Sequence, residues 1–329
     1  MRIIVNGWFL DQLATGSGQY LAGLAAWLPC AGASHELALV IPRNRPSSIV
    51  HRPSSFPPGW QLISVSTPFD GLSRDLAKLW FEQVAFPQAC RRWRAGVALV
   101  PYWGSPWWRA CPTVVTIHDL IPLLLPLYRG GLLQRAYTGL VARAARRAHA
   151  VLTDSEASRR DVIQHLRIPS DRVHAVHLAT EERYRPVGDP SELAQVRAKY
   201  DLPEEPFFLY LGGFDARKNV VRMIEAYARL TTATRQGTGG IGDQGQGIRL
   251  AIAGGLPKQD SAFAPDPRAV VERLGIRERV LFTGWVDEAD KPALYSMARG
   301  VLYLSEYEGF GLPVLEAMAC GCPVVAGGI

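Results

Sequence analysis

Apolar residues in the first half of the chain form short runs that are separated by polar and helix-like stretches. Runs of this kind are predicted as strands at 2–6, 36–41, 60–66, 97–102, 113–117, 149–153 and 172–178. Helical patterns lie between several of them. Alternation of strand and helix predicts parallel sheets that are covered by helices on both faces. We therefore predict an α/β fold, in which ligands bind outside the carboxyl ends of the strands.

A second alternating pattern begins near Leu202. Its strand candidates are 207–213, 279–286, 301–304 and 323–326. Pro186 and Pro190 precede it, in a stretch whose composition is typical of a linker. The sequence therefore predicts an N-terminal domain, a linker and a C-terminal domain over residues 1–185, 186–201 and 202–329.

Residues 231–247 are rich in glycine, threonine and other small or polar residues. The helical pattern before them runs through Val221, Ile224 and Ala228. A segment of this composition cannot form a core, so we predict a mobile surface insertion here.

Two glutamates eight residues apart flank a glycine-containing turn between a predicted strand and a predicted helix. Pro313 is suited to the first helical position, where its missing N–H leaves no bond unmade. Gly309 and Gly311 allow the backbone to approach a ligand closely, and free N–H groups at a helix start bind anions. Glu308 and Glu316 are then placed to reach different hydroxyl groups of one nucleotide sugar. The alternative is one surface glutamate and one that only complements the helix dipole.

A second strand-to-helix turn carries positive charge. The strand candidate 207–213 ends at Gly213, and Arg217 and Lys218 follow just before a helical pattern. Arginine binds phosphate in a bidentate manner, and lysine adds a point charge beside free backbone N–H groups. The strand that ends at Val286 is expected at the same edge of the sheet, where its exposed backbone can hydrogen-bond a base. A solvated pair of cations is the simpler alternative for this turn.

In the first half, His118 lies immediately beyond the carboxyl end of a predicted strand. This position favours ligand binding over a buried core histidine, and a neutral imidazole there can donate or accept a hydrogen bond. The loop after the first strand carries Gly16 and Gly18, but it lacks the third glycine and the tight spacing of a dinucleotide fingerprint. Nicotinamide chemistry is therefore disfavoured. The glycine loop is either part of a ligand site or the ordinary start of a helix.

With these motifs in this order, the chain resembles the retaining glycosyltransferases of family 4, also called glycosyl transferases group 1. The resemblance is strongest over 207–325 and clear again over 114–178, where 116–122 and 153–161 are similar to family signatures. It implies the GT-B fold, with two Rossmann-like parallel-sheet domains that face a cleft. A complete member continues beyond the strand that precedes Ile329, so the second domain is expected to be truncated.

The resemblance implies a role for each residue singled out above. Glu308 would contact the donor sugar, Glu316 the ribose, and Arg217 with Lys218 the diphosphate, while His118 would face the transferred sugar. The residues implied in catalysis are His118, Glu308, Arg217 and Lys218. Those implied in donor binding are Gly16, Gly18, Gly213, Arg217, Lys218, Val286, Glu308, Gly309, Phe310, Gly311, Leu312 and Glu316. The implied reaction is front-face displacement with retention, so the glutamates are not the acid and nucleophile of a glycosidase.

We expect neither a metal nor another cofactor. Cationic side chains and a helix N-terminus can stabilise the leaving diphosphate, and the sequence has no Asp-any-Asp motif. Cys320 and Cys322 have no second Cys or His pair beside them to complete a zinc site. The odd number of cysteines, 5, favours reduced thiols in a cytoplasm. No apolar run approaches the ~20 residues that span a bilayer, and no secretion signal begins the sequence.

The net charge of +6 suits an acidic partner, and the basic residues are clustered. The clearest clusters are Arg91, Arg92 and Arg94, near Trp103, Trp107 and Trp108, and Arg143, Arg146 and Arg147. Such a surface can dock peripherally on anionic lipid headgroups, where a polyprenyl-linked acceptor is found. Solvated helix faces explain the same residues equally well. Nucleic acid is disfavoured as a partner, because no recognised binding motif accompanies the charge.

The resemblance, taken with these observations, implies a cytoplasmic, metal-independent, retaining hexosyltransferase. It would move a sugar such as mannose from a nucleoside diphosphate sugar to a glycan or lipid-linked acceptor in bacterial polysaccharide synthesis. Two alternatives stay open: a nucleotide-sugar epimerase of the same fold, because fold alone does not fix function, and a non-catalytic nucleotide-sugar-binding protein.

Overall fold

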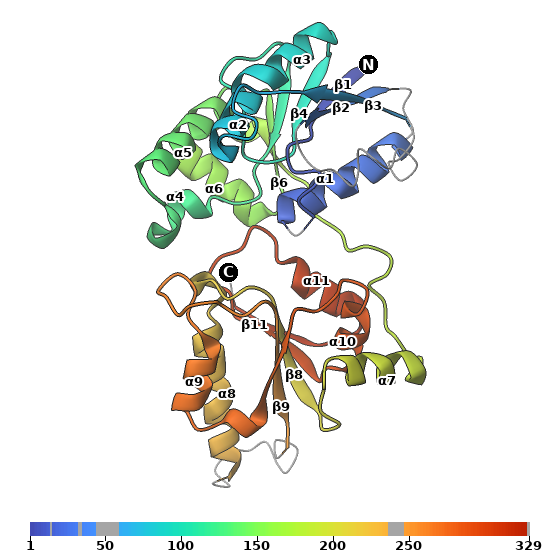
Figure 1. Ribbon diagram of the computed structural model, residues 1–329, viewed down its shortest axis with the longest axis vertical. Helices are drawn as coiled ribbons and strands as arrows, with labels where there is room; N and C mark the ends of the chain where they lie inside the picture. Colours follow the sequence, from blue (N-terminus) through green and yellow to red (C-terminus); the bar gives the residue numbers. More distant parts are fainter. Residues whose placement is uncertain (14, 32–34, 44–58, 236–246, 328–329) are drawn as a thin grey trace. The chain divides into compact units, whose positions relative to one another are not determined.

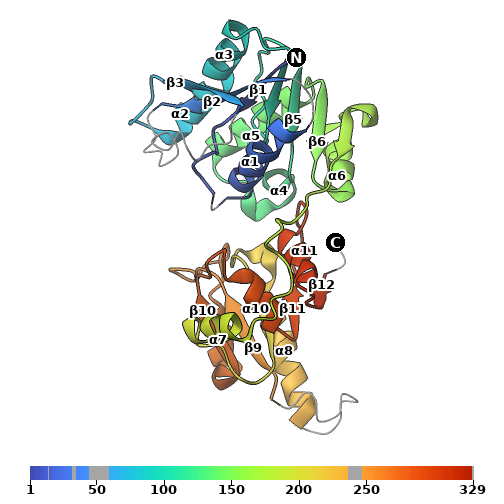
Figure 2. The same ribbon diagram turned by 90° about the vertical axis from the view of Figure 1, so that its right-hand side faces the viewer.

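The structure, a computed structural model, describes residues 1–13, 15–31, 35–43, 59–235 and 247–327. Its contacts divide the chain into two compact units, Met1–His177 and Leu178–Ile329. Each unit contains one parallel sheet with helices on both faces, as the alternating pattern predicts (Figures 1 and 2). Among the described residues, no helix combines the length and the apolar character needed to cross a membrane.

The sheet of the first unit has seven strands in the order β3-β2-β1-β4-β5-β6-β7. Their bounds are β1 Arg2–Asn6, β2 Glu36–Pro42, β3 Trp60–Val65, β4 Val97–Val100, β5 Thr113–Thr116, β6 Ala150–Thr153 and β7 Val173–Ala175. Each strand matches a predicted one to within a few residues. The strand order reverses between β1 and β4, and ligands of open parallel sheets bind at such a reversal.

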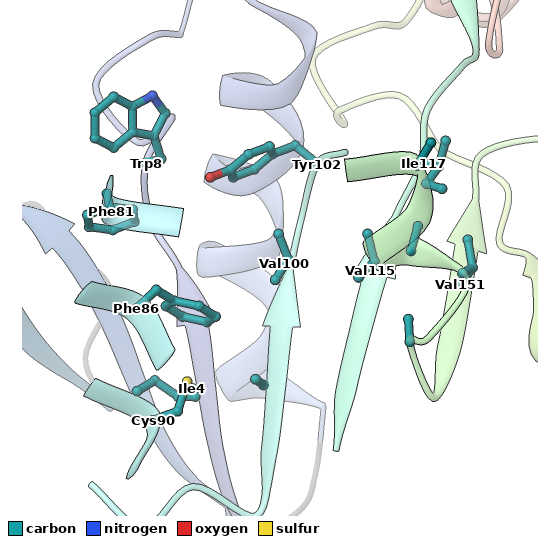
Figure 3. Packing of buried hydrophobic residues seen from close by; sticks show 14 of the residues in the cluster. Ile4, Trp8, Phe81, Phe86, Cys90, Val100, Tyr102, Val115, Ile117 and Val151 are labelled. Atoms are coloured by element: carbon teal, nitrogen blue, oxygen red, sulfur yellow. The ribbon is translucent and has the colours of Figure 1, made fainter. Parts of the chain in front are cut away.

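The helices of this unit lie on both faces of its sheet. They are α1 Gly16–Trp27, α2 Arg74–Trp80, α3 Phe86–Arg92, α4 Ile121–Leu124, α5 Leu132–Ala145 and α6 Glu156–Leu166, with a π-helical segment, Phe81–Ala85, between α2 and α3. Successive strand residues point to opposite faces. Ile4 and Val100 therefore pack with Phe86 on one face, as Figure 3 shows. Val5 packs with Leu21 of α1 on the other.

The sheet of the second unit has five strands in the order β10-β9-β8-β11-β12. The strands are β8 Phe207–Leu211, β9 Arg249–Ala253, β10 Val280–Gly284, β11 Gly300–Tyr303 and β12 Val324–Ala326. The helices are α7 Pro190–Lys199, α8 Val220–Arg235, α9 Pro267–Arg273, α10 Lys291–Met297 and α11 Leu312–Ala319. The strand order reverses between β8 and β11, so the expected ligand edge of this unit lies after these two strands.

Three features of the second unit differ from the sequence prediction. Strand β9 was not predicted, although four of its five residues, 250–253, are buried and two glycines follow them. Helix α7 occupies most of the predicted linker, and its Val196 is part of the core of the unit. Helix α8 continues to Arg235, and Thr231 is buried, so the predicted insertion does not begin at 231. Residues 236–246 of that insertion lie outside the described residues.

Candidate nucleotide-sugar site

The turns after β8 and β11 are neighbours, because these two strands are hydrogen-bonded to each other. Arg217 and Lys218 lie in a 3-10 turn that follows β8, and Glu308 lies in the loop between β11 and α11. The backbone joins the two turns directly, since the N–H of Glu306 donates to the carbonyl of Arg217 at 2.7 Å. The tertiary structure thus brings the two cations and the first glutamate to one place.

Glu308 binds both cations. Its Oε2 accepts from Nη1 of Arg217 at 2.6 Å, and its Oε1 accepts from Nζ of Lys218 at 2.5 Å. The hydroxyl of Tyr303, at the end of β11, donates to the same Oε1 at 3.0 Å. The exposed fraction of the side chain is 12% for both Glu308 and Lys218 and 17% for Arg217, so water screens these contacts only weakly.

The cluster contains as many carboxylates as cations. Nε of Arg217 also pairs with Oδ1 of Asp215 at 2.9 Å. Burial by itself would raise the pKa of Glu308, but Lys218 and Arg217 outweigh burial and hold the pKa below its ordinary value. Burial lowers the pKa of Lys218, although Glu308 opposes this shift. A phosphate that binds here must therefore compete with a carboxylate already in place.

Glu316 lies in a different environment on α11. The hydroxyl of Tyr295, from α10, donates to Oε2 of Glu316 at 2.9 Å. Burial raises the pKa of Glu316, and the positive charge of Lys291 only partly offsets this effect. One glutamate is thus held by cations and the other by a phenol. This difference suits Glu316 to accept a hydrogen bond from a neutral hydroxyl group.

The turn between the two glutamates ends at Gly311, which caps α11 in the left-handed region with φ +95°. A residue with a side chain adopts this conformation only with strain, which explains the glycine. Leu312 is the first helical residue and Pro313 the second, so the predicted start of the helix was one residue late. Gly309 and Phe310 complete the loop after Glu308.

In the first unit, His118 lies two residues beyond β5 with both ring nitrogens engaged. Nδ1 lies 2.7 Å from Oδ2 of Asp154, and Nε2 lies 3.3 Å from the carbonyl oxygen of Pro101. Both partners can accept hydrogen bonds, so a ring protonated on both nitrogens would satisfy both contacts. Burial would lower the pKa of His118, but Asp154 outweighs burial and raises it. Asp154 thus favours the charged form of the ring, and a contact of His118 with a sugar stays a prediction.

Two family models match this chain, one in each half. The family model described as Glycosyltransferase Family 4 matches residues 14–181, and the model described as Glycosyl transferases group 1 matches residues 194–328. The chain belongs to glycosyltransferase family 4. Its two parallel-sheet units are those of the GT-B fold.

Among its relatives, O-antigen chain mannosyltransferase B of Escherichia coli is 34% identical over 217 residues, which are 66% of this chain and 53% of that protein. Alpha-D-kanosaminyltransferase of Streptomyces kanamyceticus is 30% identical over 183 residues, 56% of this chain and 43% of the relative. The chain thus spans about half the length of these relatives.

Solved structures match the whole fold. Sucrose-phosphate synthase from Thermosynechococcus elongatus superposes with a TM-score of 0.71 at 22% identity, covering 100% of this chain and 82% of the other. Anabaena HepE in complex with UDP gives a TM-score of 0.65 at 17% identity, covering 99% and 81%. At these identities the likeness shows the fold alone.

Different local features explain the two glycines near the start of α1 that are predicted to line the donor site. A side chain at Gly18 would collide with the backbone carbonyl of Gln12, whereas Gly16 faces open space. The hydroxyl of Thr15 caps α1 by accepting from the N–H of Gly18 at 3.1 Å. Gly18 is therefore explained by packing at the helix start, and a contact of either glycine with a donor stays a prediction.

Two further predicted residues lie after strands of the second sheet. The hydroxyl of Tyr210 donates to the carbonyl of Gly213, which fixes the turn after β8. Val286 is buried and follows β10 by two residues, while Trp285 before it is exposed. Among the described residues, no group of three or more His, Cys, Asp or Glu side chains is arranged to hold a metal ion.

Sequence reasoning missed three residues that position the predicted ones. Tyr303 contacts both Glu308 and Lys218, Asp154 holds His118, and Tyr295 holds Glu316. Asp154 had a usable signal, because it directly follows β6 just as His118 follows the neighbouring strand β5. No sequence signal pointed to Tyr303 or Tyr295, because each lies in an apolar segment where an aromatic residue is ordinary.

Proposed function

We propose that this chain is a retaining hexosyltransferase that moves a sugar from a nucleoside diphosphate sugar to a glycan or lipid-linked acceptor in bacterial polysaccharide synthesis. The observation that carries the proposal is the cluster of Arg217, Lys218 and Glu308 at the strand-order reversal of the second sheet. Cations beside a helix start suit a diphosphate, and a carboxylate beside them suits sugar hydroxyls.

Mannose is the first candidate for the transferred sugar. Relatives of this chain are named O-antigen chain mannosyltransferase B and serotype-specific mannosyltransferase, both from Escherichia coli. A third relative is named for transfer of kanosamine, so the family likeness by itself does not fix the sugar.

Donor binding in this proposal exchanges one anion for another. The diphosphate oxygens take the place of the Glu308 carboxylate on Lys218 and Arg217, and Glu308 then accepts a hydrogen bond from a sugar hydroxyl. Glu316 gives up the hydrogen bond that it accepts from Tyr295 and accepts one from a ribose hydroxyl instead. As the bond to the sugar breaks, the two cations stabilise the charge that develops on the leaving diphosphate.

In the first unit, His118 is proposed to meet the transferred sugar as a hydrogen-bond donor. Its Nδ1 is held by Asp154 at 2.7 Å, while Nε2 has only a long contact, 3.3 Å, to a backbone carbonyl. The Nε2–H is therefore the group free to turn to a sugar oxygen. Asp154 orients the ring and favours its charged form, in which Nε2–H is a donor.

The test is a transfer assay with GDP-mannose, UDP-glucose and UDP-N-acetylglucosamine, each with mannose-terminated and glucose-terminated glycan acceptors. We expect one donor to give a longer glycan whose new linkage has the anomeric configuration of the donor, read by NMR. Glu308→Gln is the loss-of-activity control, and Glu306→Gln, on the same loop but exposed, is the matched variant that should retain activity.

Two other outcomes would contradict the proposal. An altered free nucleotide sugar without acceptor elongation would indicate an epimerase. Thermal stabilisation by one nucleoside diphosphate without turnover of any conjugate would indicate a binding protein.

A further inference from the structure

The excess of positive charge on this chain lies in one stretch of the first unit. Residues 83–153 contain nine arginines and one acidic residue, Asp119. The rest of the chain has 27 basic and 29 acidic residues. An anionic partner attracted by the charge of this protein is therefore attracted to this stretch.

Three arginines from separate parts of the first unit come together. The guanidinium of Arg147 lies 5.0 Å from the ring centre of Trp107. Burial, and then the charges of Arg147 and Arg172, lower the pKa of Arg109, so the three guanidinium groups lie within electrostatic range of one another. The guanidinium of Arg172 donates to the carbonyl of Ala148 at 3.0 Å. Carbonyl groups hold Arg172 in place without neutralising it.

This arginine cluster has no anion of its own. In the part of the chain that the structure describes, no carboxylate forms an ion pair with Arg109, Arg147 or Arg172. Nη1 of Arg109 is moreover buried without a hydrogen-bond partner. A buried charged donor that lacks a partner is costly, and like charges nearby add to the cost. A bound anion would remove both penalties.

The cluster is separate from the histidine site of the same unit. Arg109 lies just before β5, Arg147 just before β6 and Arg172 just before β7. Because these strands are parallel, the three arginines lie at the amino edge of the sheet. His118 lies beyond the carboxyl end of β5, at the opposite edge. The cluster is therefore separate from the His118 site.

Two exposed tryptophans adjoin the cluster in the same loop. The exposed fraction is 46% for Trp107 and 54% for Trp108, although indole rings are usually largely buried. Tryptophan is enriched at the boundary between lipid and water, where its ring is apolar and its N–H stays hydrated. A free phosphate compound gains nothing from these rings, whereas a lipid surface uses rings and arginines together.

We propose that the face formed by Trp107, Trp108, Arg109, Arg147 and Arg172 binds an anionic lipid surface. Arginine forks take the headgroup phosphates, and the two indoles enter the interface. This attachment is peripheral and needs no spanning helix. It goes beyond the proposed sugar transfer, and its test involves neither donor nor acceptor.

Flotation with vesicles tests this face. The wild-type protein should float with phosphatidylcholine vesicles that contain 30% phosphatidylglycerol and stay behind with pure phosphatidylcholine. Arg109→Gln/Arg147→Gln should lower the bound fraction about tenfold or more, since each arginine contributes about 1 kcal/mol at an anionic surface. The control is Arg229→Gln/Arg299→Gln, which removes the same charge from exposed positions of the second unit and should bind as wild type.

Circular dichroism establishes that each variant is folded. If the double variant fails to fold, Trp108→Ala decides the matter, because its side chain is exposed and its loss should still weaken flotation several-fold. Equal flotation of the cluster variant and the control would overturn the proposal. So would equal binding to neutral vesicles, or loss of binding in 10 mM inorganic phosphate at constant ionic strength, which would indicate a site for free phosphate.

Discussion

A single side chain, that of Glu308, occupies the cationic part of the proposed diphosphate site. In the structure its carboxylate takes both cations that the sequence assigns to a diphosphate. If Glu308 contacted only the sugar, its replacement would leave nucleotide affinity nearly unchanged. The ion pairs change this expectation, because the carboxylate and the diphosphate would compete for the same two cations.

We therefore predict that Glu308→Gln binds free nucleoside diphosphate about three- to tenfold more tightly, as expected when a competing charge-assisted bond is removed. Turnover should fall, because the donor sugar then lacks the Glu308 carboxylate that is proposed to bind its hydroxyl group. Lys218→Ala should weaken binding about tenfold or more. Isothermal calorimetry measures all three proteins, with Glu306→Gln as the charge-matched control on the same loop. Weaker binding by Glu308→Gln would show that the carboxylate does not compete with the phosphates.

His118 and Asp154 form the second pair at the residue scale. Burial and the Asp154 carboxylate act on the pKa of His118 in opposite directions, and the carboxylate prevails. Asp154→Asn removes the negative charge but keeps the size of the side chain. The pKa of His118 should then fall below its ordinary value, because burial is left unopposed. NMR titration of the ring proton measures it, with His118→Gln to assign the signal; an unchanged pKa would contradict the pairing.

At the scale of the element, helices α2 and α3 are joined by a π turn that buries a carboxylate. Glu82 of the segment Phe81–Ala85 is fully buried, and its Oε2 accepts from the hydroxyl of Tyr137 on α5 at 2.9 Å. Nζ of Lys78 lies 3.5 Å from Oε1. Burial outweighs these partners and raises the pKa of Glu82 to about 7. Inserted π turns often mark functional positions, and this one brings α5 and the α2–α3 helix together through polar contacts.

The raised pKa has a definite consequence for stability. The folded state binds the proton of Glu82 more tightly than the unfolded chain, so its contribution is fully present below about pH 4.5 and is lost as pH rises through about 7. The loss amounts to about 3 kcal/mol by linkage. Glu82→Gln should therefore flatten the fall in unfolding free energy of the first unit between pH 5 and 8. Urea denaturation at several pH values measures this, and Glu156→Gln, an exposed glutamate of the same unit, is the control. Parallel curves for wild type and Glu82→Gln would be inconsistent with the raised pKa.

At the scale of the whole molecule, the chain consists of two units with separate cores. The residues proposed to bind nucleotide all belong to the second unit, apart from the glycine loop and His118. Two units that each bury a core can unfold in separate steps. A ligand stabilises only the unit that binds it in the folded state.

We expect calorimetry to show two unfolding transitions. Saturating nucleoside diphosphate should raise the unfolding temperature of the second unit. At a ligand concentration of about a hundred times Kd, the expected gain in its free energy of unfolding is about 2.7 kcal/mol. Lys218→Ala should reduce that shift and leave the other transition unchanged. An equal shift of both transitions in the wild type would mean that the first unit also contributes to nucleotide binding.

Sugar transfer by the whole protein should also survive EDTA. The proposed stabilisation of the leaving diphosphate comes from Arg217, Lys218 and the start of α11 rather than from a metal. Activity is measured with and without EDTA and with added Mg²⁺ or Mn²⁺. Abolition by EDTA and rescue by one of these ions would move the role to a metal site.

The sequence by itself determined the strands of the first sheet and four of the five in the second, because an apolar run between turn residues is a local signal. It also determined the family, since the motifs around Arg217 and Glu308 are short and contiguous. Strand β9 was not predicted, because a glycine-rich stretch precedes it. Its apolar run and the two glycines after it nevertheless carry the same sequence signal as β8.

Only the tertiary structure decided which charges meet. Glu308 is 90 residues from Lys218, and Asp154 is 36 residues from His118, so their pairing depends on which strands are neighbours. Strand order is a property of the whole sheet, and no local pattern records it. The same holds for Arg109, Arg147 and Arg172, which are scattered along the chain. They form a cluster because β5, β6 and β7 are parallel and begin at one edge.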